Sequence, residues 1–189
     1  MYHCTYLVNR QMITEPSQIV TSLQKYVSEE DGKPMTNFQY RLEWYRIGIS
    51  IPMDVYSEKR PVLQLRPECQ LTSVEELESL PENLKEASFK IFIVPHKSLE
   101  KNEDLDQAFI EKWFQNKLKG IAEITDSTFG PNNRIYFKAN PSDETMTQLQ
   151  SYTLRGELKV KDPKRLDAIR KKSLGYFSEL GCGMLMIEC

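Results

Sequence analysis

The residues best suited to chemistry are basic, and they gather near the C-terminus. Between residues 155 and 172, eight basic side chains stand against three acidic ones, in a chain whose formal net charge is −2. The basic residues are Arg155, Lys159, Lys161, Lys164, Arg165, Arg170, Lys171 and Lys172. Such a segment attracts nucleic-acid phosphates, because each neutralised phosphate releases condensed counterions. A solvated strand and helix face would carry the same charges, so the pattern leaves both interpretations open.

A glycine-rich segment follows directly. Residues 173–188 read SLGYFSELGCGMLMIE and contain Gly175, Gly181 and Gly183. Glycine lets the backbone come close to a ligand, and exposed amides can bind phosphate oxygens. The structural alternative is a glycine that ends a helix, followed by a tight turn before the last strand.

Groups that transfer protons at neutral pH are few. The chain has two histidines, His3 within an expected strand and His96 at the end of another, and neither belongs to a nucleophile motif. There is no GxxxxGK[ST] or GxGxxG motif, so nothing supports a nucleotide-hydrolysing or dinucleotide-dependent enzyme. The four cysteines lack CxxC spacing and nothing pairs with the two histidines at ligand spacing, which disfavours a zinc site. The absence of a secretion signal predicts reduced thiols. We expect no metal and no cofactor.

The composition of the 189 residues predicts a folded protein of one domain or two small ones. Hydrophobic residues make up 40% of the chain and aromatic residues 10%, enough for a core. No apolar run approaches the ~18–20 residues of a membrane span. The N-terminus lacks the basic-then-apolar order of a signal peptide. We therefore expect a cytoplasmic protein without a membrane partner.

Hydrophobic periodicity predicts alternating strands and helices. Strand-like stretches cover residues 2–8, 38–51, 62–65, 89–94, 134–139, 152–160 and 184–187. Helical spacing predicts helices over 16–27, over 105–121 with Asp104 as its cap, and from Asp162 and Pro163 to about residue 174. An acidic helix is expected after Thr72 or Ser73, either of which could cap it, with Pro81 ending or kinking it.

The order of these elements predicts an α+β fold. A strand–helix–strand unit opens the chain and another closes it, which favours two ferredoxin-like (split βαβ) units side by side. We place the N-terminal unit at residues 1–95 and the C-terminal unit, which carries the glycine-rich loop, at 96–189. In the strand at 134–139, Ile135 and Phe137 are expected on one face. Arg134, Tyr136 and Lys138 are expected on the other, where they resemble the sheet platforms that stack single-stranded bases.

The C-terminal run RGELKVKDPKRLDAIRKKSLGYFSELGCGMLMIE resembles the closing block of the CRISPR repeat-RNA processing endoribonucleases of the RAMP superfamily. The spacing of Gly175, Gly181, Cys182 and Gly183 matches the E-subtype branch. Weaker similarities to that branch are MYHCTYLVNR, FQYRLEW and FKANP, in the expected order. The stretch RIGISIP resembles the F-subtype branch instead.

The resemblance implies a RAMP-type pair of ferredoxin-like folds that binds a repeat-derived stem-loop RNA. It also implies metal-independent cleavage, in which the 2′-OH attacks the adjacent phosphate and leaves a 2′,3′-cyclic phosphate. The processed RNA often stays bound in this family, so other CRISPR effector subunits are implied as partners. The interface we expect consists of Arg134, Tyr136 and Lys138, the eight basic residues of 155–172, and the three glycines.

This sequence departs from the family pattern at the catalytic position. The family's histidine usually lies in or just before the first helix, and residues 14–27 contain none. Lys25 and Tyr26 are what that helix offers, and with His3 and His96 they complete the catalytic candidates. Neither Lys25 nor Tyr26 is a good base at neutral pH unless its pKa is lowered.

Two alternatives remain open. One is a non-catalytic subunit of the same fold that binds guide RNA within a ribonucleoprotein complex. The other is a protein-interaction module without an RNA function, presenting the acidic helix at 74–86 and an exposed aromatic stripe of Phe109, Trp113 and Phe114. Large apolar residues at helical spacing are more often core, which weighs against this last alternative.

Overall fold

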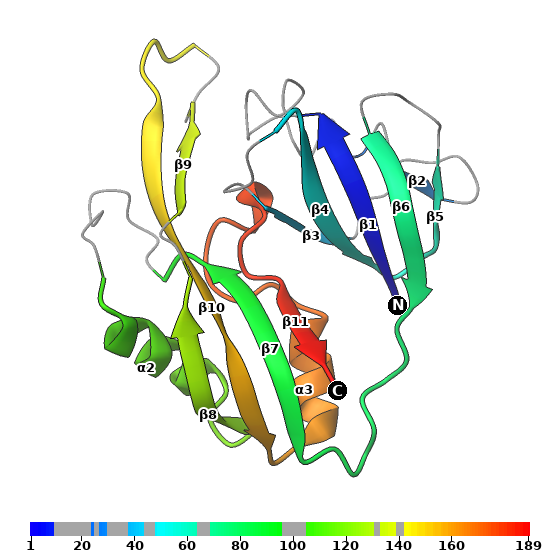
Figure 1. Ribbon diagram of the computed structural model, residues 1–189, viewed down its shortest axis with the longest axis vertical. Coiled ribbons are helices and arrows are strands. Elements are labelled where there is room, and N and C mark those ends of the chain that lie inside the picture. Colours follow the sequence, from blue (N-terminus) through cyan, green and yellow to red (C-terminus); the bar gives the residue numbers. More distant parts are fainter. Residues whose placement is uncertain are drawn as a thin grey trace. The chain divides into compact units, whose positions relative to one another are not determined.

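A computed structural model describes residues 1–9, 24, 27–29, 38–43, 48–63, 69–95, 105–130, 133–138 and 142–189 (Figure 1). The chain forms two compact units. Unit 1 comprises Met1–Glu78, Tyr136–Gln148 and Glu179–Gly181. Unit 2 comprises Ser79–Ile135, Leu149–Ser178 and Cys182–Cys189. Among the described residues, no helix is both long and apolar enough to cross a membrane.

Unit 1 is built on a four-stranded sheet in the order β3-β4-β1-β6 (Figure 1). The strands are β1 (Tyr2–Asn9), β3 (Phe38–Leu42), β4 (Ser50–Ser57) and β6 (Cys69–Glu76), and each pairs with its neighbours antiparallel. The predicted opening strand is confirmed. A separate antiparallel pair joins β2 (Val27–Glu29) to β5 (Pro61–Leu63).

Alternation along these strands gives unit 1 one apolar and one polar face. The apolar face forms a core of Cys4, Tyr6, Val8, Tyr40, Leu42, Ile51, Met53, Val55 and Cys69. Burial raises the pKa of the Cys4 and Cys69 thiols to about 11, so both stay protonated at neutral pH. No disulfide joins the four cysteines, all of which lie in the described part of the chain.

The second sheet has the order β11-β7-β10-β8, with β9 also paired to β10 (Figure 1). Its strands are β7 (Glu86–Ile93), β8 (Ala122–Phe129), β9 (Asn133–Phe137), β10 (Thr147–Val160) and β11 (Leu185–Glu188). The strands predicted at 89–94, 134–139, 152–160 and 184–187 are confirmed, β10 being longer than expected at its N-terminal end. Together the two sheets make the predicted α+β fold.

Two helices are described in unit 2. Helix α2 (Gln107–Lys117) buries Ile110 and Phe114, and the Phe114 ring packs on Phe89 of β7 with centroids 5.1 Å apart. Helix α3 (Pro163–Arg170) begins as the sequence predicts, with the Asp162 side chain accepting the Arg165 N–H at 3.0 Å. It ends at Arg170, short of the predicted residue 174.

Besides α3, three predicted elements differ from the structure in their bounds or composition. The stretch 38–51 is not one strand. It contains β3 and the first residues of β4, and these two strands pair antiparallel from Phe38↔Ser57 to Leu42↔Met53. The helix over 105–121 begins later, with Asp106 as its cap, and Asp104 lies outside the described residues. Of the helix expected over 16–27, Gln24 is helical, Val27 lies in strand β2, and the other residues lie outside the described ones.

The predicted acidic helix is wrong: the segment is strand β6, which pairs with β1. Thr72 or Ser73 could cap a helix here, but as a strand the segment brings Cys69, Leu71 and Val74 into the core of unit 1. Pairing with β1 along the strand outweighs a helical preference of a few tenths of a kcal/mol per residue. Pro81 then follows in an irregular stretch after β6.

Replacing Gly183 by alanine should lower the free energy of unfolding by about 2–4 kcal/mol. Gly183 has φ +91°, and an added Cβ would lie 2.3 Å from the Leu174 carbonyl oxygen. The matched control is Gly120→Ala, with φ +73° but only the flexible Arg165 guanidinium nearby, at 3.8 Å. Strain alone should cost that variant about 1 kcal/mol. Urea unfolding measures both, and equal losses would contradict the steric argument.

Candidate functional site

On unit 1, His3 lies beside a carboxylate of the neighbouring strand. Its Nε2 is 3.0 Å from Oδ1 of Asp54, and the Thr5 hydroxyl donates to the same oxygen at 3.4 Å. The His3 and Tyr56 rings meet edge to face with centroids 5.2 Å apart. A carboxylate only accepts hydrogen bonds, so the Nε2–H donates in this contact, and Nδ1 is the atom at which a neutral ring can accept a proton. This is the arrangement of an oriented general base.

Arg41 and Glu43 add charge to the same polar face. Arg41 is opposite Asp54 in register, is 1% exposed, and donates through Nη2 to Oε1 of Glu43. Burial lowers the pKa of the Arg41 guanidinium, against the opposing effects of Glu43, Asp54 and Tyr56. Arginine still keeps its proton at neutral pH. The face thus combines an imidazole, carboxylates and a cation, the groups that acid–base chemistry on a phosphate requires.

Strand β9 has the two faces that the sequence predicts. Ile135 and Phe137 are buried, whereas Arg134 is exposed and Tyr136 is half exposed. Lys138 follows the end of the strand and is partly buried. Arg134 and Tyr136 offer a cation and an aromatic surface side by side on one strand, which suits a phosphate next to a stacked base.

Two basic residues of the segment 155–172 form ion pairs with one carboxylate of the protein. Asp167 accepts from Arg170 Nη2 and from Lys171 Nζ, both at 2.6 Å, and from the Leu80 N–H at 3.4 Å. Arg170 is only 3% exposed, so its side chain is not available to a ligand. Burial raises the pKa of the Asp167 carboxyl, but the Lys171 hydrogen bond, the Arg170 charge and the Leu80 N–H outweigh it and lower the pKa overall.

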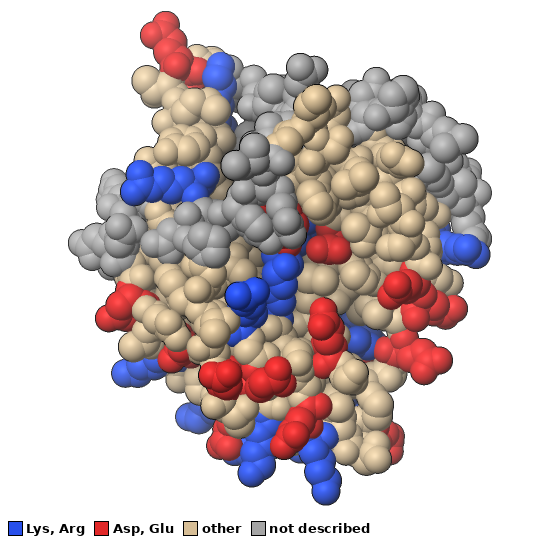
Figure 2. All heavy atoms as spheres, in the orientation of Figure 1, with Lys and Arg blue, Asp and Glu red and all other residues tan. Residues whose placement is uncertain are grey.

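The other basic side chains of the segment are exposed. Lys161 contacts Glu123 at 2.5 Å and Lys164 contacts Glu82 at 2.9 Å. The remaining exposed members are Arg155, Lys159, Arg165, Lys171 and Lys172. Figure 2 shows acidic and basic side chains close together over the lower part of the view, not one continuous basic area. Because Arg170 is buried and three of the lysines pair with carboxylates, fewer cations are available to a nucleic acid than the segment contains.

Packing accounts for two of the three glycines. Gly183 is required by its contact with Leu174 described above. Gly181 is buried against the ring of Tyr40, 2.9 Å from an added Cβ, and the Tyr40 hydroxyl donates to the Glu179 carbonyl. Gly175 is exposed, near Trp113 and the Val94 carbonyl. The structural interpretation therefore suffices for Gly181 and Gly183, and only Gly175 presents backbone to solvent.

The other catalytic candidates, Lys25, Tyr26 and His96, lie outside the described residues. Within the described part of the chain, no three side chains of His, Cys, Asp or Glu come together as a metal-binding group would.

Sequence reasoning missed Asp54, Arg41 and Asp167 as parts of charged clusters. Alternation in 50–57 could have placed Asp54 on the polar face, opposite Met53 and Val55. Nothing local could have shown that this face adjoins His3, because His3 and Asp54 are 51 residues apart in sequence and the register between their strands is a tertiary property.

The fold, α+β with two antiparallel sheets, is shared with CRISPR-associated proteins of known structure. Cas6e from Escherichia coli strain K-12, a CRISPR-associated protein, matches with a TM-score of 0.78 at 17% identity, covering 100% of this chain and 99% of that one. A CRISPR endoribonuclease Cse3 bound to a 19-nucleotide RNA matches at 0.77 and 19%, covering 100% of both chains. Thermus thermophilus Cse3, bound to an RNA representing a pre-cleavage complex, matches at 0.76 and 18%, covering 100% and 99%.

The sequence gives the same assignment independently. Residues 9–188 match the model of the family described as CRISPR associated protein, and the chain belongs to that family. No curated protein sequence matches it. The resemblance found in the C-terminal block is thereby confirmed.

Replacing Asp167 by asparagine should lower the free energy of unfolding at pH 7 by about 2–3 kcal/mol, because it leaves the buried Arg170 without its carboxylate. A carboxyl with a lowered pKa stabilises the fold at neutral pH, and this contribution is lost as the pH falls through that pKa. The difference between wild type and Asp167→Asn should therefore shrink below the ordinary aspartate pKa of 3.8. Urea unfolding from pH 7 to pH 3 measures it, and a pH-independent difference would refute the assignment.

Proposed function

We propose that this chain binds the stem-loop RNA of CRISPR repeats and cleaves it in the cytoplasm without a metal ion. The observation that carries the proposal is the full-length similarity to structures described as a CRISPR endoribonuclease bound to RNA. The family match over residues 9–188 supports the same function. Because one similar structure is described as an RNA-guided surveillance complex, we further infer that other subunits of such a complex are partners.

In the proposed reaction, the 2′-oxygen of one nucleotide attacks the adjacent phosphorus. The bond from phosphorus to the 5′-oxygen of the next nucleotide breaks, leaving a 2′,3′-cyclic phosphate and a 5′-hydroxyl. A base takes the 2′-proton and an acid supplies one to the leaving oxygen. Among the described residues, His3 has the geometry of the base, with Asp54 as its positioning residue. Lys25, Tyr26 and His96 remain candidates for the acid and for stabilising charge on the phosphorane.

The RNA surface we propose is narrower than the set predicted from sequence. It retains Arg134, Tyr136, Lys138 and Gly175, with the exposed cations Arg155, Lys159, Arg165 and Lys172 as its main phosphate contacts. Lys161, Lys164 and Lys171 join it only where RNA displaces their carboxylate partners. Gly181 and Gly183 support the loop without contacting RNA.

A second candidate function is a non-catalytic subunit that holds guide RNA. It is favoured by the absence of a histidine from residues 14–27. Neither feature that suggested a protein-interaction module without an RNA function is present. The acidic segment is strand β6 and not a helix, and in the aromatic stripe Phe114 is buried while Phe109 is exposed.

Replacing His3 by alanine should slow cleavage of a labelled repeat stem-loop by about 10²–10⁴-fold, the usual contribution of a general base. Asp54→Asn should slow cleavage less and change its pH profile, because the substitution disturbs the tautomer of His3 but leaves the imidazole in place. Single-turnover reactions in EDTA on denaturing gels measure the rate, and native gels of the same mixtures should show unchanged binding.

A parallel variant, His96→Gln, tests the other histidine of the chain as the base. If that variant loses cleavage while His3→Ala keeps it, the base is assigned to the wrong histidine. If wild-type protein shifts the RNA but leaves it intact, the guide-holding function replaces the nuclease.

Single alanine variants of Arg165 and Lys172 should each weaken stem-loop binding and reduce the slope of log K against log salt by about 1. Lys161→Ala is the control, since its ammonium already pairs with Glu123 and should change the slope less. Fluorescence anisotropy at several salt concentrations measures these slopes. Unchanged slopes for Arg165 and Lys172 would remove this surface from the interface.

A further inference from the structure

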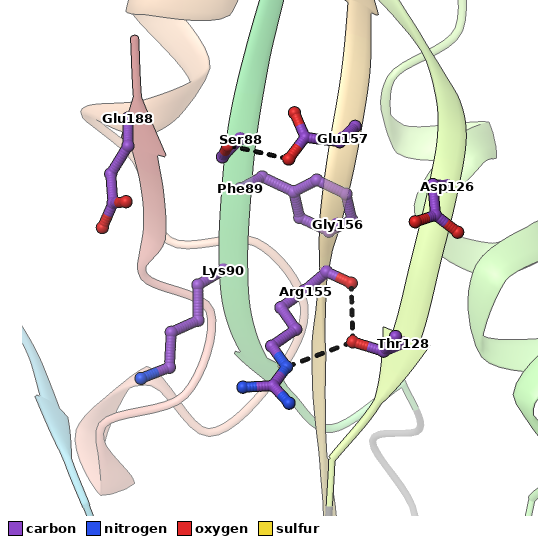
Figure 3. A pocket seen from close by; sticks show the side chains of 9 residues that line it. All are labelled: Ser88, Phe89, Lys90, Asp126, Thr128, Arg155, Gly156, Glu157 and Glu188. Carbon is purple, nitrogen blue, oxygen red and sulfur yellow. Dashed lines mark hydrogen bonds between the residues drawn. The ribbon is translucent and has the colours of Figure 1, made fainter.

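A pocket of about 290 Å³ lies on the sheet face of unit 2 that points away from its core (Figure 3). Lys90, Arg155 and Glu157 line it and alternate along β7 and β10 with the core residues Ile91 and Leu154. The volume is at the small end of the range for ligand sites, which suits a single nucleotide.

One end of the pocket is cationic. Arg155 of β10 and Lys90 of β7 are direct partners in the strand register, and their side chains extend in the same direction (Figure 3). Arg155 Nε donates to the Thr128 hydroxyl at 3.1 Å, which orients the guanidinium. An anion bound between the two side chains would interact favourably with both positive charges.

The other end is acidic. Glu157 follows Arg155 by two residues on the same face, about 7 Å further along the strand, and its carboxylate points toward Ser88 (Figure 3). The Ser88 hydroxyl donates to Oε1 of Glu157 at 2.9 Å, which fixes the carboxylate. Asp126 is opposite Glu157 on β8, and Glu188 is opposite Ser88 on β11. This end therefore presents hydrogen-bond acceptors to a ligand.

The two ends together require a ligand with an anion at one side and adjacent donors at the other. Guanine is the base that meets this requirement, because its N1–H and N2–H₂ groups are neighbouring donors that can both reach one carboxylate. These two donors lie on the Watson–Crick edge of guanine. On the same edge of adenine, cytosine and uracil, every donor is flanked by acceptors only, and a carboxylate repels an acceptor. RNA-binding proteins commonly read unpaired bases on this edge.

We propose that the pocket binds one unpaired guanosine nucleotide of RNA. Its phosphate lies between Lys90 and Arg155, and the N1–H and N2–H₂ groups of the base donate to Glu157. This inference deepens the proposed RNA-binding function and rests on it. It adds a base preference that the basic residues alone cannot provide, because phosphate contacts carry no sequence information.

The test uses the whole chain and four labelled pentamers of uridine that differ at the central position, which is guanosine, inosine, adenosine or cytidine. Fluorescence anisotropy at low salt should give about tenfold tighter binding of the guanosine RNA than of the adenosine and cytidine RNAs. Inosine keeps N1–H but lacks the N2 amine, so its RNA should bind with intermediate affinity.

Two variants separate the ends of the pocket. Glu157→Gln should abolish the preference for guanosine, while Arg155→Ala should weaken all four RNAs equally and reduce the salt slope by about 1. The matched control is Glu86→Gln, an exposed carboxylate on β7 outside the pocket, which should change neither.

The outcomes distinguish this inference from the proposed function. Stem-loop binding without a guanosine preference, or a preference that survives Glu157→Gln, overturns the pocket and leaves the proposed function standing. A guanosine preference lost in Glu157→Gln supports the pocket, even if the stem-loop itself is not bound. Failure to bind either RNA overturns both.

Discussion

The pairing of β10 with β7 is the constraint on which unit 2 depends. Eight consecutive residue pairs, from Tyr152↔Ile93 to Lys159↔Glu86, hold the two strands in one register. Because side chains alternate along a strand, this register sends Leu154 and Leu158 into the core and Arg155 and Glu157 to the opposite face. A slip of one residue would exchange the two faces, and would cost the core and the candidate pocket together.

Charge pairing then decides which basic residues are available to a ligand. Asp167 holds the buried Arg170 and the partly exposed Lys171, an arrangement that stabilises helix α3 against the stretch before β7 through Leu80. The dense run of cations near the C-terminus is therefore partly a structural device. What remains exposed is a smaller set of positive charges interspersed with acids, which suits selective contacts better than a general attraction to polyanions.

The two ferredoxin-like units carry different chemistry. The polar face of unit 1 places His3 beside Asp54, where proton transfer is possible, whereas the polar face of unit 2 combines cations with carboxylates, where recognition is possible. At 17–19% identity, the similarity to Cas6e and Cse3 extends to the fold, and the groups that act on RNA have to be argued from this chain's own residues.

Local sequence patterns are sufficient to predict the α+β class, the strands with regular alternation, the Asp162–Pro163 start of α3 and the family. These features depend on local periodicity, helix capping and short motifs, all of which are present in the order of the amino acids. Four features became visible only once the chain was folded: 69–76 is a strand, Asp54 adjoins His3, Arg170 is buried, and Lys90 is opposite Arg155. Each of these depends on strand register or on burial among residues far apart in the chain, and burial energies exceed the local propensities that sequence patterns report.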